Sequence, residues 1–254
     1  MTVIIYKKTL IVILIIIAIF VCSMSLYKND EVALALNNKV NKKLPVYSVE
    51  DDTKVALTFD AAWGADKTEE ILNTLNKFNV KGTFFLVGFW IDKYPSLVKK
   101  IYDLGFDIGN HSITHLDMTK LNESQRINEI NLTNEKIKNI TGESPKFFRF
   151  PYGAYNLDSV LSVEKQGMIP IQWDVDSLDW KGLNETEILK RIQDKVKGGS
   201  IILFHNNSEH VLDALPLVVD YLLSKNYELV PLSQLVYEDN YIIDINGVQH
   251  RNVI

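Results

Sequence analysis

Two histidines in the segment HSITH have the spacing of metal ligands. His111 and His115 are four residues apart, which would place both imidazoles on one face of a helical turn. Neutral imidazole binds zinc and other divalent transition metals, although two histidines near an ordinary helix start would show the same spacing. Such a site usually includes a carboxylate. The candidate, Asp60 in TFDAAWG, is followed directly by Ala61, which has no ligand atom.

Further polar residues could carry out acid–base chemistry. Asp60 could accept a proton from a metal-activated water, or could simply cap the loop that follows it. Arg149, in RFPYGAYN, could pair with this carboxylate and keep it ionised, while the backbone N–H of Tyr152 could stabilise an oxyanion. A plain turn with a solvated arginine is the alternative. His205 ends the apolar segment ILFH and would suit general acid catalysis if an aspartate orients it.

Aromatic residues accompany these polar groups. The segment WDVDSLDW contains three aspartates and two tryptophans in eight residues. Tryptophan faces stack against sugar rings as readily as they fill a core, so Trp63, Trp90, Trp173 and Trp180 divide between these two roles. We assign Trp173 to the core.

The elements that would position these residues alternate along the chain. Strands are expected at 54–60, 82–88, 106–110, 146–150, 168–175, 200–205 and 227–232, and helices at 67–78, 95–105, 121–142, 185–199 and 211–226. Asn122 or Ser124 is expected to cap the third helix, and Gly142 to end it. Strict alternation predicts parallel strands, in a barrel or a doubly wound sheet.

The candidate residues gather at one end of these strands. In parallel barrels the rim at the C-terminal ends of the strands carries the active site, because loops from many strands converge there. The residues at or just past such ends are Asp60, His111, Arg149, Asp176 and His205.

Composition and the N-terminus restrict the class of protein. The net charge of -5 argues against a nucleic-acid partner, and the single cysteine, Cys22, excludes an intrachain disulfide. Residues 1–27 contain an apolar run preceded by two lysines, and its length approaches the ~20 residues of a membrane-spanning helix. We expect an uncleaved anchor with the remainder outside the cytoplasm, a cleaved signal or a lipoprotein being alternatives. Residues 28–52 are predicted to form a spacer, and 239–254 a short terminal strand or disordered tail.

The five motifs, in this order, resemble those of the polysaccharide deacetylase family, the NodB-homology domain of carbohydrate esterase family 4. They are TFDAAWG, HSITH, RFPYGAYN, DVDSLDW and ILFHN. The resemblance spans roughly residues 50–238 and implies a catalytic domain over 53–238. It implies a distorted (β/α) barrel of about seven parallel strands. The implied activity is removal of N-acetyl groups from amino sugars of peptidoglycan or a chitin-like polysaccharide.

The resemblance also implies roles for individual residues. Asp60 would be the catalytic base and Arg149 would tune it. Tyr152 would stabilise the oxyanion through its backbone N–H. His111 and His115 would bind a divalent metal, usually zinc in this family, with cobalt or another divalent ion as alternatives.

The remaining role falls to the last two motifs. His205 would protonate the leaving amine, and Asp179 would hold its imidazole, with Asp176 as the alternative. Metal, base and acid would then cooperate in hydrolysis of the acetamide. These roles agree with the chemistry that the residue types alone indicate.

Ala61 departs from the family pattern. Most members have at this position a second aspartate, which binds the metal. Water could complete the coordination of a weaker two-histidine site, Asp66 could substitute for the missing carboxylate, or the metal could be lost. In the last case the domain would bind glycan without turnover.

We expect a monomeric, membrane-anchored, metal-dependent N-deacetylase, because Asp60, Arg149, Asp179 and His205 are all retained. The FDAAWG form of the first motif resembles a branch from Gram-positive spore formers, which points to spore or cell-wall peptidoglycan. The alternative is a non-catalytic glycan-binding domain without metal. A glycosidase would leave the histidine pair unexplained.

Overall fold

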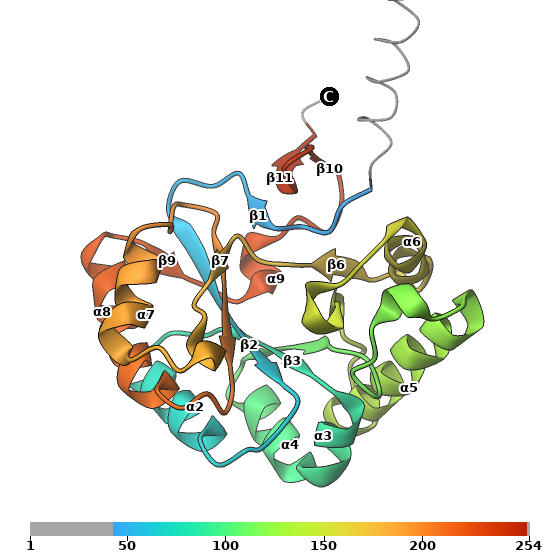
Figure 1. The fold of residues 1–254 in the computed structure, drawn as a ribbon, viewed down its shortest axis with the longest axis horizontal. Coiled ribbons are helices and arrows are strands. Elements are labelled where there is room, and N and C mark those ends of the chain that lie inside the picture. Colours follow the sequence, from blue (N-terminus) through green and yellow to red (C-terminus); the bar gives the residue numbers. More distant parts are fainter. Residues whose placement is uncertain (1–42, 253–254) are drawn as a thin grey trace, which may run out of the picture. The chain divides into compact units, whose positions relative to one another are not determined.

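The computed structural model describes residues 43–252 (Figure 1). The predicted anchor at 1–27 and the first part of the predicted spacer lie outside the described residues. Within 43–252, the helices are too short or too polar for any of them to span a membrane.

Seven parallel strands form the central sheet. Their spatial order is β6-β5-β4-β3-β2-β8-β7, and the short strand β9 pairs with β2 as well. Because β6 and β7 end the path and are not paired with each other, the barrel is open between them. This arrangement confirms the predicted parallel (β/α) architecture. The bounds are β2 Lys54–Ala61, β3 Thr83–Leu86, β4 Asp107–Asn110, β5 Phe147–Arg149, β6 Ile169–Ile171, β7 Val175–Asp176, β8 Ile201–His205 and β9 Glu228–Leu229.

Helices surround the strands on the outside (Figure 1). The predicted helices are present as α2 Thr68–Lys77, α4 Pro95–Asp103, α5 Glu123–Thr141, α7 Glu185–Gln193 and α8 Val211–Ser224. Three more were not expected, namely α3 Gly88–Lys93, α6 Leu157–Lys165 and α9 Leu232–Leu235. Short 3₁₀ turns occur at η1 Met118–Lys120, η2 Pro151–Gly153 and η3 Asp179–Lys181.

The alternation of side chains along β2 explains how an acidic group can end a buried strand. Val55, Leu57 and Phe59 belong to the large apolar cluster between sheet and helices. Successive side chains on a strand point to opposite faces, so Thr58 and Asp60 point to the other side, where both contact Arg149. The strand therefore anchors itself in the core with one face and presents a carboxylate at its C-terminal end with the other.

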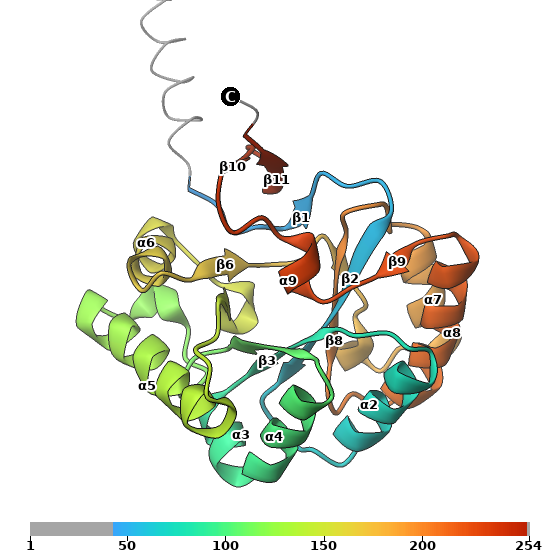
Figure 2. The same cartoon turned by 180° about the vertical axis from the view of Figure 1, so that it is seen from behind.

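Residues of the predicted spacer and tail complete the fold. β1 Ser48–Val49 pairs with β11 Val248–Arg251, which pairs with β10 Tyr241–Ile243. Val46 joins the barrel through hydrogen bonds to Pro170 and Gln172. Figure 2 shows this small sheet beside β6 and α9. The packed region thus extends beyond the expected range of 53–238.

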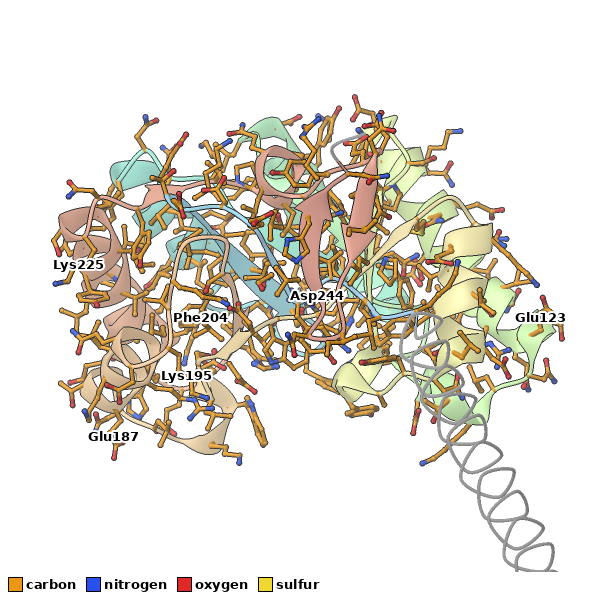
Figure 3. All side chains as sticks on the ribbon, turned by 90° about the horizontal axis from the view of Figure 1, so that it is seen from above. Glu123, Glu187, Lys195, Phe204, Lys225 and Asp244 are labelled. Atoms are coloured by element: carbon orange, nitrogen blue, oxygen red, sulfur yellow. The ribbon has the colours of Figure 1, made fainter. Side chains whose placement is uncertain are left out.

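Charged and apolar side chains separate as the predicted topology requires. Glu123, Glu187 and Lys225 lie at the periphery, whereas Phe204 of β8 lies inside (Figure 3). Phe59 stacks on Phe84 and Phe204, with ring centroids 4.9 and 5.8 Å apart. This packing fixes β2 between its neighbours β3 and β8, and so fixes the strand that carries Asp60.

Candidate active site

A cavity of about 710 Å³ opens at the C-terminal ends of the strands. Arg149, which is fully buried, and Asp66, which is exposed, do not line it. The other predicted site residues do. The lining residues are Asp60, Ala62, Trp63, His111, His115, Tyr152, Trp173, Asp176, Asp179, Trp180, Gly182, Leu203, His205, Asn206, Asn207, Ser208 and Glu209.

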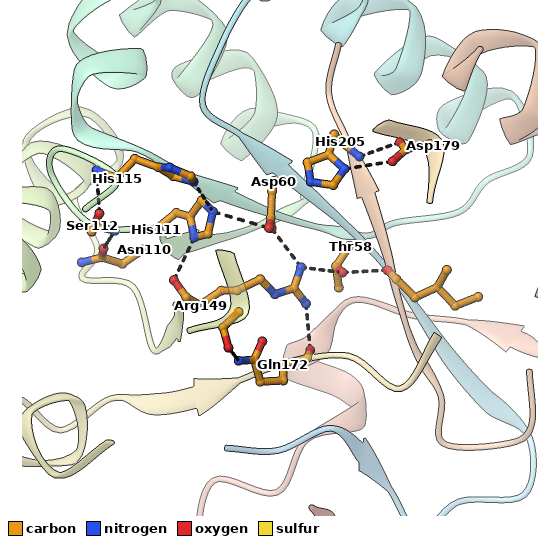
Figure 4. Close-up of polar contacts among 12 residues, drawn as sticks. Thr58, Asp60, Asn110, His111, Ser112, His115, Arg149, Gln172, Asp179 and His205 are labelled. Atoms are coloured by element: carbon orange, nitrogen blue, oxygen red, sulfur yellow. Dashed lines mark hydrogen bonds and ion pairs between the residues drawn. The ribbon is translucent and has the colours of Figure 1, made fainter. Parts of the chain in front are cut away.

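Asp60 and Arg149 form a buried ion pair at the floor of the cavity (Figure 4). Nη1 of Arg149 donates to Asp60 Oδ1 at 2.9 Å and to Thr58 Oγ1 at 2.8 Å, and Nη2 donates to the Gln172 carbonyl at 3.0 Å. Burial alone would raise the pKa of Asp60, but His111 and Arg149 beside it hold that pKa below its ordinary value. The carboxylate is therefore ionised, as a general base must be.

The two histidines bring their ring nitrogens together. Nδ1 of His111 lies 2.8 Å from the carbonyl oxygen of Arg149, which can only accept, so the ring hydrogen is on Nδ1. Nε2 of His111 then lies 3.3 Å from Nε2 of His115 and 3.4 Å from Oδ2 of Asp60. Burial lowers the pKa of His115 to about 4 and lowers that of His111 also. Both imidazoles are therefore neutral and can act as metal ligands.

The histidine segment is not a helical turn, so that part of the sequence prediction is wrong. HSITH, called the histidine loop below, has left-handed backbone at Ser112 (φ 68°) and His115 (φ 60°). The buried Glu129 of α5 holds the loop. Its carboxylate accepts the backbone N–H groups of Ile113 and Thr114 at 3.1 and 3.0 Å and the Thr114 hydroxyl at 2.7 Å. Sequence analysis missed Glu129, whose only signal was a carboxylate on the inner face of a helix.

His205 is held by Asp179 on the opposite side of the cavity (Figure 4). Asp179 Oδ1 lies 2.9 Å from His205 Nδ1, and Oδ2 accepts the backbone N–H of His205 and the hydroxyl of Ser208, each at 2.8 Å. Burial lowers the pKa of His205, but the bond to Asp179 and nearby carboxylates outweigh it and raise the pKa. The alternative partner, Asp176, instead accepts the backbone N–H of Leu178.

Tyr152 presents its backbone to the site. It has left-handed backbone (φ 60°, ψ 9°) within η2, and Gln172 braces the turn through a hydrogen bond to the Gly153 carbonyl. Within residues 43–252 the Tyr152 backbone N–H has no hydrogen-bond acceptor. Its ring lies 4.6 Å from that of His115, and the residue is 69% exposed. The free N–H beside the histidine pair is what an oxyanion donor requires.

Position 61 carries no group that faces the cavity. Ala61 is fully buried in the same apolar cluster as Val87 and Trp90, and the cavity is lined by Ala62 instead. The exposed Asp66 is not brought to the histidines. Within residues 43–252, no group of three or more His, Cys, Asp or Glu side chains is arranged to hold one ion.

The tryptophans divide between core and cavity. Trp90 is buried and donates to the Gly64 carbonyl at 2.7 Å. Trp63 and Trp180 line the cavity with 58% and 56% exposure. Trp173, which we assigned to the core, is only half-buried; it lines the cavity and also packs against a buried apolar cluster that includes Val46, Ile171 and Val230. Two exposed tryptophans at a cavity mouth suit the faces of sugar rings.

Comparisons with known proteins identify the family. The sequence model of the family described as polysaccharide deacetylase matches residues 48–171. A peptidoglycan-N-acetylglucosamine deacetylase from Bacillus cereus is 36% identical, over 72% of this chain and 68% of that protein. A peptidoglycan-N-acetylmuramic acid deacetylase from Bacillus subtilis is 33% identical over 78% of this chain, but the chain spans only 44% of that protein.

A solved structure shares the fold. It is a pseudoenzyme of carbohydrate esterase family 4 from Bacillus anthracis, 29% identical, with a TM-score of 0.74 over 82% of this chain and 73% of that one. The identity to the Bacillus cereus protein, and the share of each chain that the match covers, establish common family membership. This chain belongs to the polysaccharide deacetylase family.

Proposed function

We propose that this chain is a metal-dependent hydrolase that removes N-acetyl groups from amino sugars of peptidoglycan or a chitin-like polysaccharide. The observation that carries the proposal is the pairing of a buried base with an oriented acid. Asp60 and His205 are register partners on the adjacent parallel strands β2 and β8. Both side chains line one cavity, and each has its own charged partner, Arg149 and Asp179.

The protein groups account for the proton transfers of acetamide hydrolysis. Asp60 accepts a proton from water as the oxygen bonds to the acetyl carbon, and the Tyr152 N–H donates to the oxyanion. The carbon–nitrogen bond then breaks while His205 gives its proton to the sugar nitrogen. Acetate and a free amine result. Asp179 stabilises the protonated imidazole before this transfer.

His111 and His115 would hold the metal. The fit lies in the donor set, two neutral imidazole nitrogens that converge beside an ionised carboxylate oxygen. When bound, a divalent ion such as zinc or cobalt would polarise the acetyl carbonyl and lower the pKa of water. Since Ala61 provides no ligand, we expect weaker metal binding than in a three-ligand site.

The alternative is a glycan-binding domain without turnover, and its support is the buried, ligand-free Ala61. The placement we propose is outside the cytoplasm, on a membrane anchor at residues 1–27, as a monomer acting on the cell wall or spore wall. The support for it is the sequence pattern alone, two lysines followed by an apolar run.

Acetate release tests the proposal. The chain is incubated with N-acetylglucosamine tetramers or peptidoglycan, with zinc or with chelator, beside an Asp60→Asn variant that keeps the shape of the base. Acetate from the wild type alone, abolished by chelator, supports the hydrolase. Glycan binding without acetate under any divalent ion would leave the binding domain as the function.

A further inference from the structure

The two enzymatic relatives are named for different sugars, N-acetylglucosamine and N-acetylmuramic acid. The two sugars share the acetamide. They differ by a lactyl ether, which ends in a free carboxylate wherever no peptide is attached. The charges that line the cavity can therefore distinguish them. The inference below rests on the proposed function and specifies its substrate.

The cavity lining is acidic. It includes four carboxylates, and within the described chain none of its residues is lysine or arginine. Arg149 lies outside the lining, and its two Nη atoms donate to Asp60, Thr58 and the Gln172 carbonyl. The imidazole of His205 is hydrogen-bonded to the carboxylate of Asp179. The four carboxylates belong to Asp60, Asp176, Asp179 and Glu209.

Two of these carboxylates are available to a ligand. Asp176, at the end of β7, accepts one backbone N–H through Oδ1, and its Oδ2 has no hydrogen bond within residues 43–252. Glu209, in the loop after β8, has a side chain 75% exposed, and its ion-pair contact is with His210 at 3.9 Å. Such oxygens accept hydrogen bonds from sugar hydroxyls and repel another carboxylate.

Neighbouring cations do not offset this pattern. Lys67 beside the same loop donates to the carbonyls of Ser208 and Glu209 at 2.6 and 2.7 Å. The Lys181 ammonium lies over the Trp180 ring, 4.9 Å from its centroid, and Lys181 does not line the cavity. A lactyl carboxylate would thus find no lysine or arginine of the lining as a counter-charge, and burying a charge without such a partner is costly.

We propose that the cavity deacetylates the uncharged N-acetylglucosamine unit and discriminates against N-acetylmuramic acid that carries a free carboxylate. Trp63 and Trp180, both exposed in the lining, provide apolar faces for the sugar rings. Asp176 and Glu209 accept hydrogen bonds from the hydroxyl groups of the sugars.

A single substrate containing both sugars gives the sharpest test. The chain is given a peptide-free tetrasaccharide of alternating N-acetylglucosamine and N-acetylmuramic acid, and mass spectrometry of fragments locates the lost acetyl groups. We expect at least about tenfold more loss from glucosamine units. Methyl esterification of the lactyl groups removes their charge and should make the loss of acetyl groups from the two sugars more nearly equal. Equal loss, preference for muramic acid, or undiminished rejection of the ester would overturn the inference.

Variants test whether the carboxylates are responsible. Asp176→Asn and Glu209→Gln should each narrow the preference by about two- to fivefold. Asp220→Asn, the same charge change on the exposed face of α8, and Lys181→Ala should leave it unchanged. Equal narrowing by Asp176→Asn, Glu209→Gln and Asp220→Asn would assign the preference to overall charge and contradict the inference.

Failure of the proposed function would be recognised separately. If no acetate appears from any sugar, the hydrolase proposal fails. Binding of the tetrasaccharide and of its methyl ester, followed by tryptophan fluorescence, then tests the inference alone. Tighter binding of the ester supports it, and tighter or equal binding of the free acid overturns it.

Discussion

Asp179→Asn should lower the pKa of His205 and shift the pH dependence of catalysis. The carboxylate of Asp179 contacts both the imidazole and the backbone N–H of His205, at 2.9 and 2.8 Å, and it is almost completely buried. Asparagine keeps the shape and removes the charge. The protonated imidazole, which the proposed mechanism needs as its acid, would lose its main stabilising partner.

The size of the effect follows from the contact. An opposite charge at hydrogen-bond distance changes a pKa by about 1 to 3, and His205 is partly exposed, so we expect a fall of about 1 to 2. Well above both pKa values, the protonated fraction and with it kcat/KM should drop about 10- to 100-fold. The raised pKa also means that the contribution of the pair to stability is complete below the unfolded pKa of about 6.5 and is lost as pH rises through the folded value.

Two measurements check this. The alkaline limb of kcat/KM against pH should move to lower pH in Asp179→Asn. NMR titration of His205 should show the fall in its pKa directly, whether or not the variant is active. Ser208→Ala removes one hydrogen bond to Asp179 without a charge, so it should move the titration much less. An unmoved limb, or a higher His205 pKa in the asparagine variant, would refute the assignment of His205 as the acid held by Asp179.

Three further predictions concern the supports of the site. Arg149→Met should lower the free energy of unfolding, measured by urea titration, by about 3–5 kcal/mol, because it leaves the Asp60 carboxylate buried without its arginine partner. Adding Asp60→Asn should restore part of this stability, and a double variant no more stable than Arg149→Met would count against the pairing. Glu129→Gln should weaken zinc binding about tenfold, measured by isothermal titration calorimetry, because it loosens the histidine loop. Unchanged affinity would mean that the loop keeps its conformation without the Glu129 carboxylate. Gly199→Ala should lower the melting temperature, because the residue has φ 81° and a Cβ there would lie 1.7 Å from the Val49 carbonyl; an unchanged value would contradict the packing of β1.

The strands and most helices could be predicted because their signals are local. Runs of β-branched and aromatic residues mark β2, β3 and β8 to within a few residues of the observed bounds. Asn122 caps α5 reciprocally with Gln125, and Gly142 ends it at φ 85°. Parallel pairing of strands then brings their C-terminal ends to one rim, which is why residues far apart in sequence converge.

Features that depend on distant partners could not be predicted. The expected strand at 168–175 is divided into β6 and β7, which join different ends of the sheet path. β1 and β11 are short and pair across nearly the whole described chain, so neither carries a pattern of its own. α6 was not predicted, although it is as long as α4 and α7 and begins with a reciprocal cap between Asn156 and Ser159.

In the site too, residue types could be predicted from local signals, whereas contacts between distant residues could not. Asp179 was the expected partner of His205, with Asp176 as the alternative, because spacing alone does not say which aspartate turns back toward the histidine. Asp176 is the last residue of β7 and bonds within its own turn, whereas left-handed backbone at Leu178 (φ 55°) redirects the chain so that Asp179 reaches His205. The histidine loop likewise takes its shape from Glu129, a residue of another element.

Metal-dependent turnover is the central claim, and it is tested most directly by acetate release from N-acetylglucosamine tetramers as zinc is titrated into metal-free chain. His111→Ala serves as the matched variant. Acetate formation should saturate with zinc in the wild type, disappear with chelator, and be absent in His111→Ala at the same zinc concentration. Glycan binding without acetate at any concentration of zinc or cobalt would contradict it.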